Sequence, residues 1–399
     1  MDEFIGSNPG FESSLAVEPA SPSGTRPTWA QIDLDNLVHN FRVMSDLAGP
    51  AVAVMPAVKA DAYGHGAAEC ARALEKAGAD WLGVALPEEG MKLRQAGISC
   101  RILCLAGFWE GQEELIVEMG LTPTITRGEL LYPLDRAAGA GGRVINFHLK
   151  LDTGMGRLGI SPADLDKVLD AVAELKNVRL DGFMTHLAAA DEPDKSDFTR
   201  EQMKLFADAL AIVRDRGHRP AWIHQANSAA TMAYPQARGN LVRLGGSIFG
   251  TWRDTTDRSS CSADLRPVMS LRTRIILLKT VPPGTSIGYG CTFITARESR
   301  IATLPIGYND GLRRGLSNRG SVLVRGAHAP IAGRVTMDHA MIDVTDVADA
   351  AVGDEVVVIG RQGRAEIAAE DIAAQIGTIS YEVTCGVGDR VPRVYKSGI

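Results

Sequence analysis

The 399-residue chain contains little that would suit it to a membrane or to nucleic acid. It has no apolar run as long as the roughly 20 residues that a bilayer-crossing helix needs. Its 42 lysines and arginines are outnumbered by 48 aspartates and glutamates, and they form no long basic run. Because nucleic acids and anionic lipids attract clustered positive charge, we expect neither a nucleic-acid partner nor a membrane partner.

Cysteine is scarce and scattered. No two of the six cysteines form a CxxC pair, and no group of histidines stands beside them. Thiols in this pattern are typical of a reduced protein, so we expect a cytoplasmic location and no metal site. The cysteines are Cys70, Cys100, Cys104, Cys261, Cys291 and Cys385.

The first 26 residues lack the basic start and apolar middle of a secretory signal. They are rich in glycine, serine, proline and glutamate. We expect residues 1–26 to be a disordered tail; the alternative is an ordered arm that packs on a partner subunit.

Residues 27–265 alternate short apolar runs with amphipathic helices. Residues 51–58 and 81–86 favour strands, and residues 67–77 favour a helix that ends at Gly78. About eight such units in this length favour a (β/α)8 barrel over an open sheet. With 45% apolar residues, the chain can bury a large core.

After residue 265 the pattern changes to strands joined by turns. Gly353-Asp354 and Gln362-Gly363 are typical turn pairs, and one late helix is expected around Ile372 and Ile376. We therefore predict a mostly β C-terminal domain over residues 266–399. Its expected strands are 272–281, 300–304, 321–325, 340–344 and 355–359.

One lysine stands where a barrel strand should end. The segment AVKADAYGHG begins at Ala57, so Lys59 leaves an apolar run directly before a loop of small residues. Active sites of barrels lie at the C-terminal ends of the strands, and partial burial favours a neutral, nucleophilic amine. The ordinary alternative is a solvated lysine at a strand end.

Three more motifs follow expected strands. KLDTGMGRLG begins at Lys150 and offers Arg157 as a fork for a carboxylate, although it could be a surface arginine in a turn. HQANSAA contains Ser228, which could bind phosphate or cap a helix. VRLGGSIFG begins at Val242, and its glycines let backbone N–H groups approach an anion.

These motifs, in this order, resemble those of the alanine racemase family, and the resemblance extends across nearly the whole chain after the tail. It implies a barrel that binds pyridoxal 5'-phosphate (PLP), followed by a β domain. It also implies a head-to-tail homodimer that interconverts L-alanine and D-alanine. Lys59 matches the lysine that holds PLP as a Schiff base, and Tyr289, in GTSIGYGCTF, matches the second catalytic base, supplied by the partner subunit.

The resemblance also assigns the surroundings of the cofactor and substrate. Arg157 is implied to bind the substrate carboxylate, and Lys150 matches a lysine that is often carbamylated. Tyr308, in LPIGYNDG, and Met337, in GRVTMDHAMIDVT, match residues that line the substrate path and pocket. The residues implied to contact PLP besides Lys59 are Tyr63, His186, Ser228, Arg243, Gly246 and Tyr381.

Arg243 matches the arginine that faces the pyridine nitrogen of PLP. Arginine can only donate hydrogen bonds, so the ring nitrogen opposite it should stay unprotonated. PLP is then a weaker electron sink, which suits an enzyme that only moves a proton.

Three positions depart from the family pattern: Asp61 replaces a common Asn, Phe249 a common Tyr, and Thr336 a common Cys. Residues 188–198 look like an insertion of this chain. These differences leave open a broader serine/alanine racemase of the same fold. A PLP-barrel decarboxylase would be expected to differ at the C-terminal motifs, and a non-catalytic PLP carrier would lack the second domain.

Overall fold

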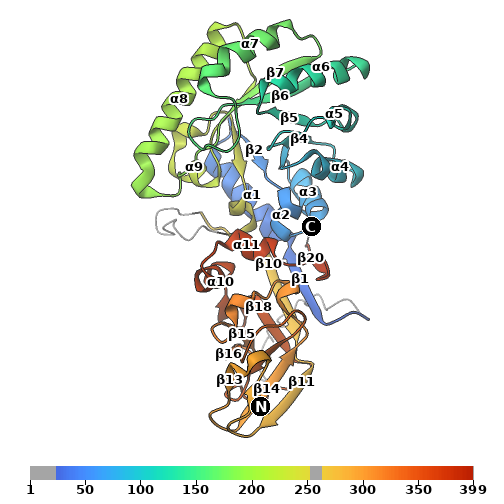
Figure 1. Cartoon of the computed structure of the whole chain (residues 1–399), viewed down its shortest axis with the longest axis vertical. Coiled ribbons are helices and arrows are strands. Elements are labelled where there is room, and N and C mark those ends of the chain that lie inside the picture. The colour runs from blue at the N-terminus through green and yellow to red at the C-terminus, as the bar shows by residue number, and fades with distance from the viewer. Residues whose placement is uncertain (1–23, 252–262, 399) are drawn as a thin grey trace, which may run out of the picture.

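The computed structural model describes residues 24–251 and 263–398. Most of the predicted tail, residues 1–23, lies outside the described residues. The chain forms two lobes along its long axis, one of alternating strands and helices and one built mainly of strands (Figure 1). Among the described residues, no helix is both long enough and apolar enough to cross a membrane.

Parallel strands form a closed ring in the first lobe. Within residues 24–251, β3 to β8 pair in chain order, and β2 pairs with β9. The Val58 amide donates to the Gly83 carbonyl (2.8 Å) between β2 and β3, and the Asn240 amide donates to Ile223 (3.1 Å) between β8 and β9. These bonds complete an eight-stranded barrel, so the predicted fold class is confirmed. The strands are β2 (Ala53–Pro56), β3 (Trp81–Val84), β4 (Arg101–Cys104), β5 (Thr122–Ile125), β6 (Ile145–Lys150), β7 (Val178–Met184), β8 (Trp222–His224) and β9 (Leu241–Leu244).

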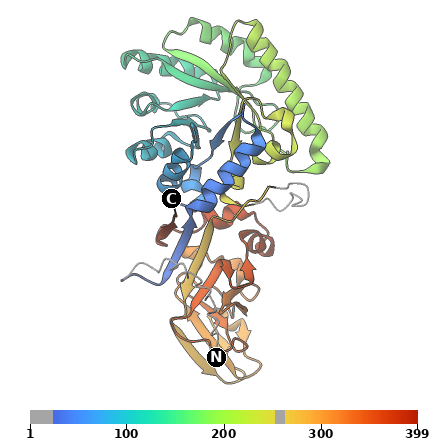
Figure 2. The same cartoon turned by 180° about the vertical axis from the view of Figure 1, so that it is seen from behind.

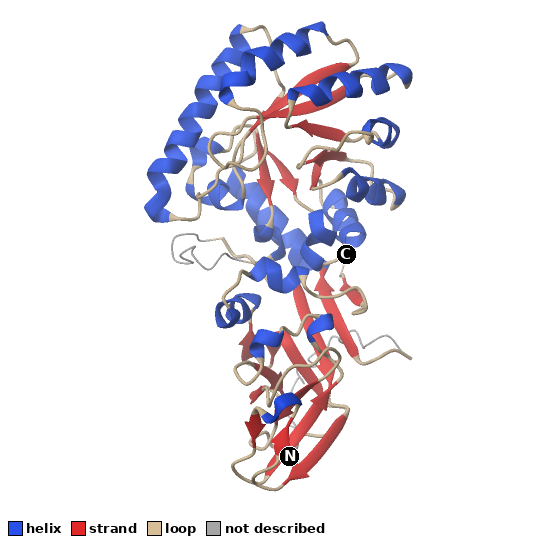
Figure 3. Ribbon diagram, viewed as in Figure 1, coloured by secondary structure: helices blue, strands red, loops and turns tan. Residues whose placement is uncertain are grey.

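Helices cover the outside of this ring (Figure 3). α3, which lies within the helix predicted over residues 67–77, buries Cys70, Ala71 and Leu74. The Ser161 hydroxyl accepts from the Ala163 amide (3.3 Å), as expected of a residue that caps the helical turn before α7. The helices are α1 (Leu34–Ala48), α2 (Lys59–Gly64), α3 (Ala67–Lys76), α4 (Pro87–Gln95), α5 (Glu113–Met119), α6 (Leu131–Ala140), α7 (Leu165–Glu174), α8 (Ser196–Asp215) and α9 (Ser228–Ala233).

The second lobe is built around a sheet in the order β16-β15-β18-β10-β1-β20, with β19 beside β18. A three-stranded sheet, β11-β14-β17, and the hairpin β12-β13 extend it. Its other strands and helices are β10 (Met269–Arg274), β11 (Leu277–Val281), β12 (Ser286–Ile287), β13 (Phe293–Ile294), β14 (Ser299–Leu304), β15 (Ser321–Val324), β16 (Ala327–Pro330), β17 (Ala340–Asp343), β18 (Glu355–Gln362), β19 (Ala365–Ile367), α10 (Ala369–Ile376), α11 (Ser380–Cys385) and β20 (Arg393–Lys396).

The first strand of the described residues belongs to this second lobe. β1 (Thr28–Asp33) pairs antiparallel with β10 and parallel with β20, the last strand. Figure 2 shows β1 in blue beside β10 before the chain rises into α1. The chain therefore passes between the lobes at Asp33 as well as after the barrel. The domain boundaries at residues 27 and 265 stay predictions.

Candidate active site

A cavity of about 470 Å³ lies at the C-terminal ends of the barrel strands. This volume is in the range of small-molecule and cofactor sites. The structure brings nine of the predicted site residues together around it, from both the barrel and α11. They are Lys59, Tyr63, Lys150, Arg157, His186, Ser228, Arg243, Gly246 and Tyr381.

Lys59 begins a left-handed turn directly after β2. The residues from Ala60 to Tyr63 have φ between 51° and 55° and ψ between 35° and 50°. For residues other than glycine this conformation costs roughly 1–2 kcal/mol each. The turn places the side chains of Lys59 and Tyr63 on the wall of the same cavity. Backbone strain beside a cavity is typical of a functional site.

The strain makes a testable prediction for Ala60, which has a φ of 51°. We expect Ala60→Gly to stabilise the chain by up to about 1 kcal/mol, because relief of the left-handed strain outweighs the greater flexibility of unfolded glycine. Ala73→Gly in the right-handed helix α3 is the control, with an expected loss of about 1 kcal/mol. Urea unfolding of both variants measures the difference. Equal losses would show that the turn is not strained.

Two lysines in the cavity have a lowered pKa. Burial lowers the pKa of Lys59, and the nearby Arg157 lowers it further, while the Glu89 carboxylate acts in the opposite direction. Burial, then Arg243 and Arg157, lower the pKa of Lys150 from 10.5 to about 8. A lowered pKa leaves more of each amine neutral at physiological pH, and the neutral amine is the nucleophile.

Two adjacent glycines form a narrow cradle between two tyrosine rings. A Cβ on Gly246 would lie 2.0 Å from Cε1 of Tyr381, and one on Gly245 would lie 2.5 Å from the Tyr63 hydroxyl. The Gly245 amide donates to the Ser228 hydroxyl (2.9 Å). Burial raises the pKa of Tyr63, so its hydroxyl stays protonated and able to donate. Backbone, serine and tyrosine donors in this arrangement fit a phosphate group.

A buried arginine connects the cavity to two histidines inside the barrel. Arg243 Nη1 lies 2.9 Å from His224 Nδ1, and His224 Nε2 lies 2.9 Å from His148 Nδ1. Because arginine can only donate, His224 must carry its proton on Nε2 and donate it to His148. Burial lowers the pKa of His148 to about 3 and that of His224 well below its ordinary value. In this row of hydrogen bonds, Arg243 therefore carries the positive charge and both histidines stay neutral.

The sequence identified Arg243 but missed these two histidines. Their signal was present, since His148 and His224 both stand in apolar strands, but a histidine in a buried strand is also typical of an ordinary core. Asp191 and Cys385 also line the cavity and were not assigned there. Asp191 lies in the segment that looks like an insertion, so no motif pointed to it.

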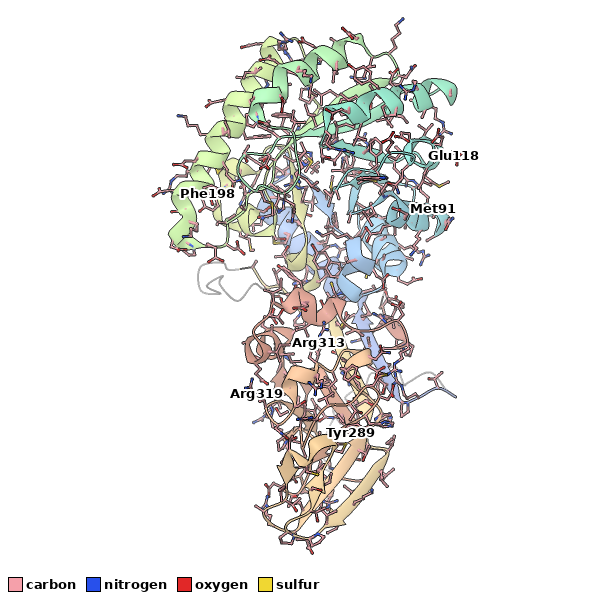
Figure 4. The ribbon with its side chains drawn as sticks, viewed as in Figure 1. Met91, Glu118, Phe198, Tyr289, Arg313 and Arg319 are labelled. Atoms are coloured by element: carbon pink, nitrogen blue, oxygen red, sulfur yellow. The ribbon has the colours of Figure 1, made fainter. Side chains whose placement is uncertain are left out.

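Three predicted site residues lie in the other lobe. Tyr289 is 72% exposed and lies well away from the barrel (Figure 4). Met337 is 53% exposed and Tyr308 is 38% exposed. None of the three is among the described residues that line the cavity of their own chain. Nine of the predicted site residues therefore line the cavity, and the other three lie exposed on the second lobe of the same chain.

The chain matches known proteins over nearly its whole length. The family model for the alanine racemase N-terminal domain matches residues 32–252, and that for the alanine racemase C-terminal domain matches residues 268–395. The alanine racemase of Halothermothrix orenii is 47% identical, over 94% of this chain and 98% of the relative. That of Symbiobacterium thermophilum is 46% identical, over 93% of this chain and 98% of the relative.

Solved structures agree with these matches. The alanine racemase of Streptomyces lavendulae, a D-cycloserine producer, superposes with a TM-score of 0.87 at 40% identity, covering 94% of this chain and 98% of its own. That of Bacillus anthracis, with bound L-Ala-P, has a TM-score of 0.88 at 34% identity, covering 94% and 96%. The sequence motifs, the fold and the cavity all agree with these findings: the chain belongs to the alanine racemase family.

Proposed function

We propose that this chain is a PLP-dependent racemase that interconverts L-alanine and D-alanine. The observation that carries the proposal is the cavity, which joins the Lys59 amine, the glycine cradle and Arg157 in one space. The family matches over both domains support a racemase over a PLP-barrel decarboxylase. A broader serine/alanine racemase remains the second candidate, since Asp61, Phe249 and Thr336 depart from the family pattern.

The residues around the cavity suit PLP. Lys59 would attach it covalently, and the cradle of Ser228, Gly246 and Tyr381, with Tyr63, would hold its phosphate. When bound, PLP withdraws electrons from the substrate and makes its Cα–H bond acidic. Arg243, held by the Thr185 carbonyl (2.8 Å) and by His224, would face the ring nitrogen and keep it unprotonated. His186, which accepts from Arg243 at 3.2 Å, would lie near the ring.

Racemisation needs one proton-transferring group on each face of the substrate carbon. The Lys59 amine supplies one group from the barrel, and Arg157 would orient the substrate carboxylate. Tyr289 would supply the other, and its exposure on the second lobe supports delivery to the cavity of a partner subunit. Tyr308 and Met337 would line the substrate path from the same lobe. The active protein would therefore be a homodimer with shared sites.

A reducing compartment suits this enzyme. The described cysteines are all free, and Cys70 and Cys104 are buried. Because disulfides are rare where thiols stay reduced, this supports the cytoplasm as its location.

The proposed reaction is tested by proton NMR in D2O. With PLP and L-alanine, we expect loss of the α-proton signal and formation of D-alanine at matching initial rates, because each proton transfer exchanges with solvent. L-serine under the same conditions tests the broader racemase. PLP binding without either change with alanine would contradict alanine as substrate and leave the family assignment in place.

The low pKa of Lys150 predicts a carbamate at this position. With the pKa at about 8 instead of 10.5, the neutral amine is a few hundredfold more abundant at pH 7. The neutral amine adds to carbon dioxide with loss of one proton, and the resulting anion would pair with Arg157. We expect isotopically labelled carbon dioxide to label Lys150, less so as the pH falls below about 8, since protonation removes the nucleophile. Lys150→Arg is the control, and labelling of that variant at the same level would refute the assignment.

A further inference from the structure

The strained turn after Lys59 is held at its start by one carboxylate. Glu89, in α4, accepts from the Ala60 amide at 2.7 Å through Oε1. Its other oxygen accepts from the Ala85 amide (2.6 Å) and the Leu86 amide (3.2 Å). The Glu89 side chain therefore ties the residue next to Lys59 to the start of a neighbouring barrel helix.

The end of the turn is held by an arginine from the second lobe. Arg393 donates to the Gly64 carbonyl from Nε (3.2 Å) and Nη2 (3.1 Å). The same guanidinium donates to the carbonyls of Gly388 and Val387, both at 2.7 Å. Gly64 itself has a φ of 85°, and a Cβ there would lie 2.3 Å from the Thr384 carbonyl oxygen. Only glycine therefore fits at position 64, where the backbone lies close against α11.

The two contacts matter because the turn is unfavourable by itself. Residues that are not glycine leave the left-handed region when nothing holds them there, since other backbone conformations are lower in energy. The hydrogen bonds within the turn start at the Ala62 amide, which donates to Val58 at 2.9 Å. The Ala60 amide precedes them and is held by Glu89. Relaxation at Ala60 would rotate the peptide that follows Lys59 and move its amine.

We propose that Glu89 is a positioning residue for Lys59, which holds the left-handed turn in the conformation that aims the amine into the cavity. Arg393 fixes the far end of the same turn. The inference rests on the proposed function only in that Lys59 is taken as the residue that attaches PLP.

The test separates covalent capture from cofactor binding. In Glu89→Gln, one carboxylate oxygen becomes an amide nitrogen, which cannot accept a hydrogen bond. The remaining oxygen keeps the two donors at Ala85 and Leu86, so the contact with the Ala60 amide is lost. We expect PLP capture at Lys59, trapped by borohydride and located by peptide mapping, to slow by about tenfold or more, because a misplaced nucleophile reacts slowly. Pyridoxamine 5'-phosphate has no aldehyde, and we expect its affinity to change by less than about twofold.

Glu88→Gln is the matched control, because it removes the same charge one residue away. The Glu88 carboxylate accepts from Gln112 (2.7 Å) and not from the turn, so capture should stay at the wild-type rate. Arg393→Lys should also slow PLP capture and leave the affinity for pyridoxamine 5'-phosphate nearly unchanged. This variant replaces Glu89→Gln in the test if Glu89→Gln does not fold. Equal losses of capture and of pyridoxamine phosphate affinity would show a merely structural role, and an unchanged capture rate would also overturn the proposal. Failure of the wild-type chain to capture PLP at Lys59 would instead contradict the proposed function, and no amino-acid substrate is needed for any of these measurements.

Discussion

Dimers that combine one Lys59→Ala chain with one Tyr289→Phe chain will regain activity that neither parent dimer has. If each site takes Lys59 from one barrel and Tyr289 from the partner, the mixed dimer carries both substitutions in one site and neither in the other. We expect about half of the wild-type turnover from a purified mixed dimer, since one of its two sites is intact. Each parent alone should lose nearly all racemisation, because a group on one face of the substrate carbon is missing in both sites.

The experiment needs two affinity tags, co-expression and sequential purification, so that only mixed dimers are assayed. Tyr132→Phe is the matched control for the tyrosine change, because Tyr132 is 45% exposed on α6 and outside the cavity. Dimers that mix Lys59→Ala with Tyr132→Phe should also be half active, but Tyr132→Phe alone should be fully active. A mixed dimer of the Lys59 and Tyr289 variants with no activity would refute the shared site.

The barrel could be read from the sequence because each of its units carries a local signal. The strands predicted over residues 51–58 and 81–86 and the helix predicted over residues 67–77 all stand where the residue pattern placed them. The pairing of β1 had no such signal. A short apolar run before a helix has the same pattern whether its strand joins a nearby sheet or a distant one. Here Thr28 in β1 pairs with Thr273 in β10, more than 200 residues later.

The conformation of the lysine segment was equally hidden. Alanine and tyrosine rarely adopt positive φ, so nothing in Ala60, Ala62 or Tyr63 predicts a left-handed turn. Both ends of the turn are hydrogen-bonded to residues elsewhere in the chain, Glu89 on α4 and Arg393 on β20. Tertiary hydrogen bonds outweigh local preference here, which single-sequence reasoning cannot foresee. The place of Lys59 in the chain fold needs no such contact, because it depends only on where β2 ends.

The site residues also divide into those that the barrel topology could place and those that it could not. Residues that follow barrel strands, such as Ser228 after β8 and Gly246 after β9, could be placed at one rim by topology alone. Tyr289 could be linked to them only through the family resemblance, because it lies in a separate lobe of its own chain. Arg157 and Arg243 also lie on the walls of the cavity. Their positive charges suit the two anions of the proposed complex, the cofactor phosphate and the substrate carboxylate.

Arg157 is the member of this cationic group that faces the substrate in our proposal, so its removal should mainly weaken substrate binding. We expect Arg157→Ala to lower kcat/KM for alanine by about a hundredfold, the scale of losing a charge-assisted pair with a carboxylate. The rise in KM should exceed the fall in kcat, because the carboxylate is held in the ground state as well as in the transition state. Initial rates over a range of alanine concentrations, with PLP saturating, measure both constants.

Arg127→Ala is the control, because Arg127 follows β5 and lies against the exposed ring of Trp109 (5.6 Å), outside the cavity. Added guanidinium ion should restore part of the activity of Arg157→Ala, and urea, which is uncharged and of similar shape, should not. Arg157→Lys should fall between the wild type and the alanine variant, since an ammonium keeps the charge but loses the planar fork. A fall in kcat with unchanged KM would place Arg157 at a proton-transfer step instead. The carboxylate would then need another partner on the walls of the cavity.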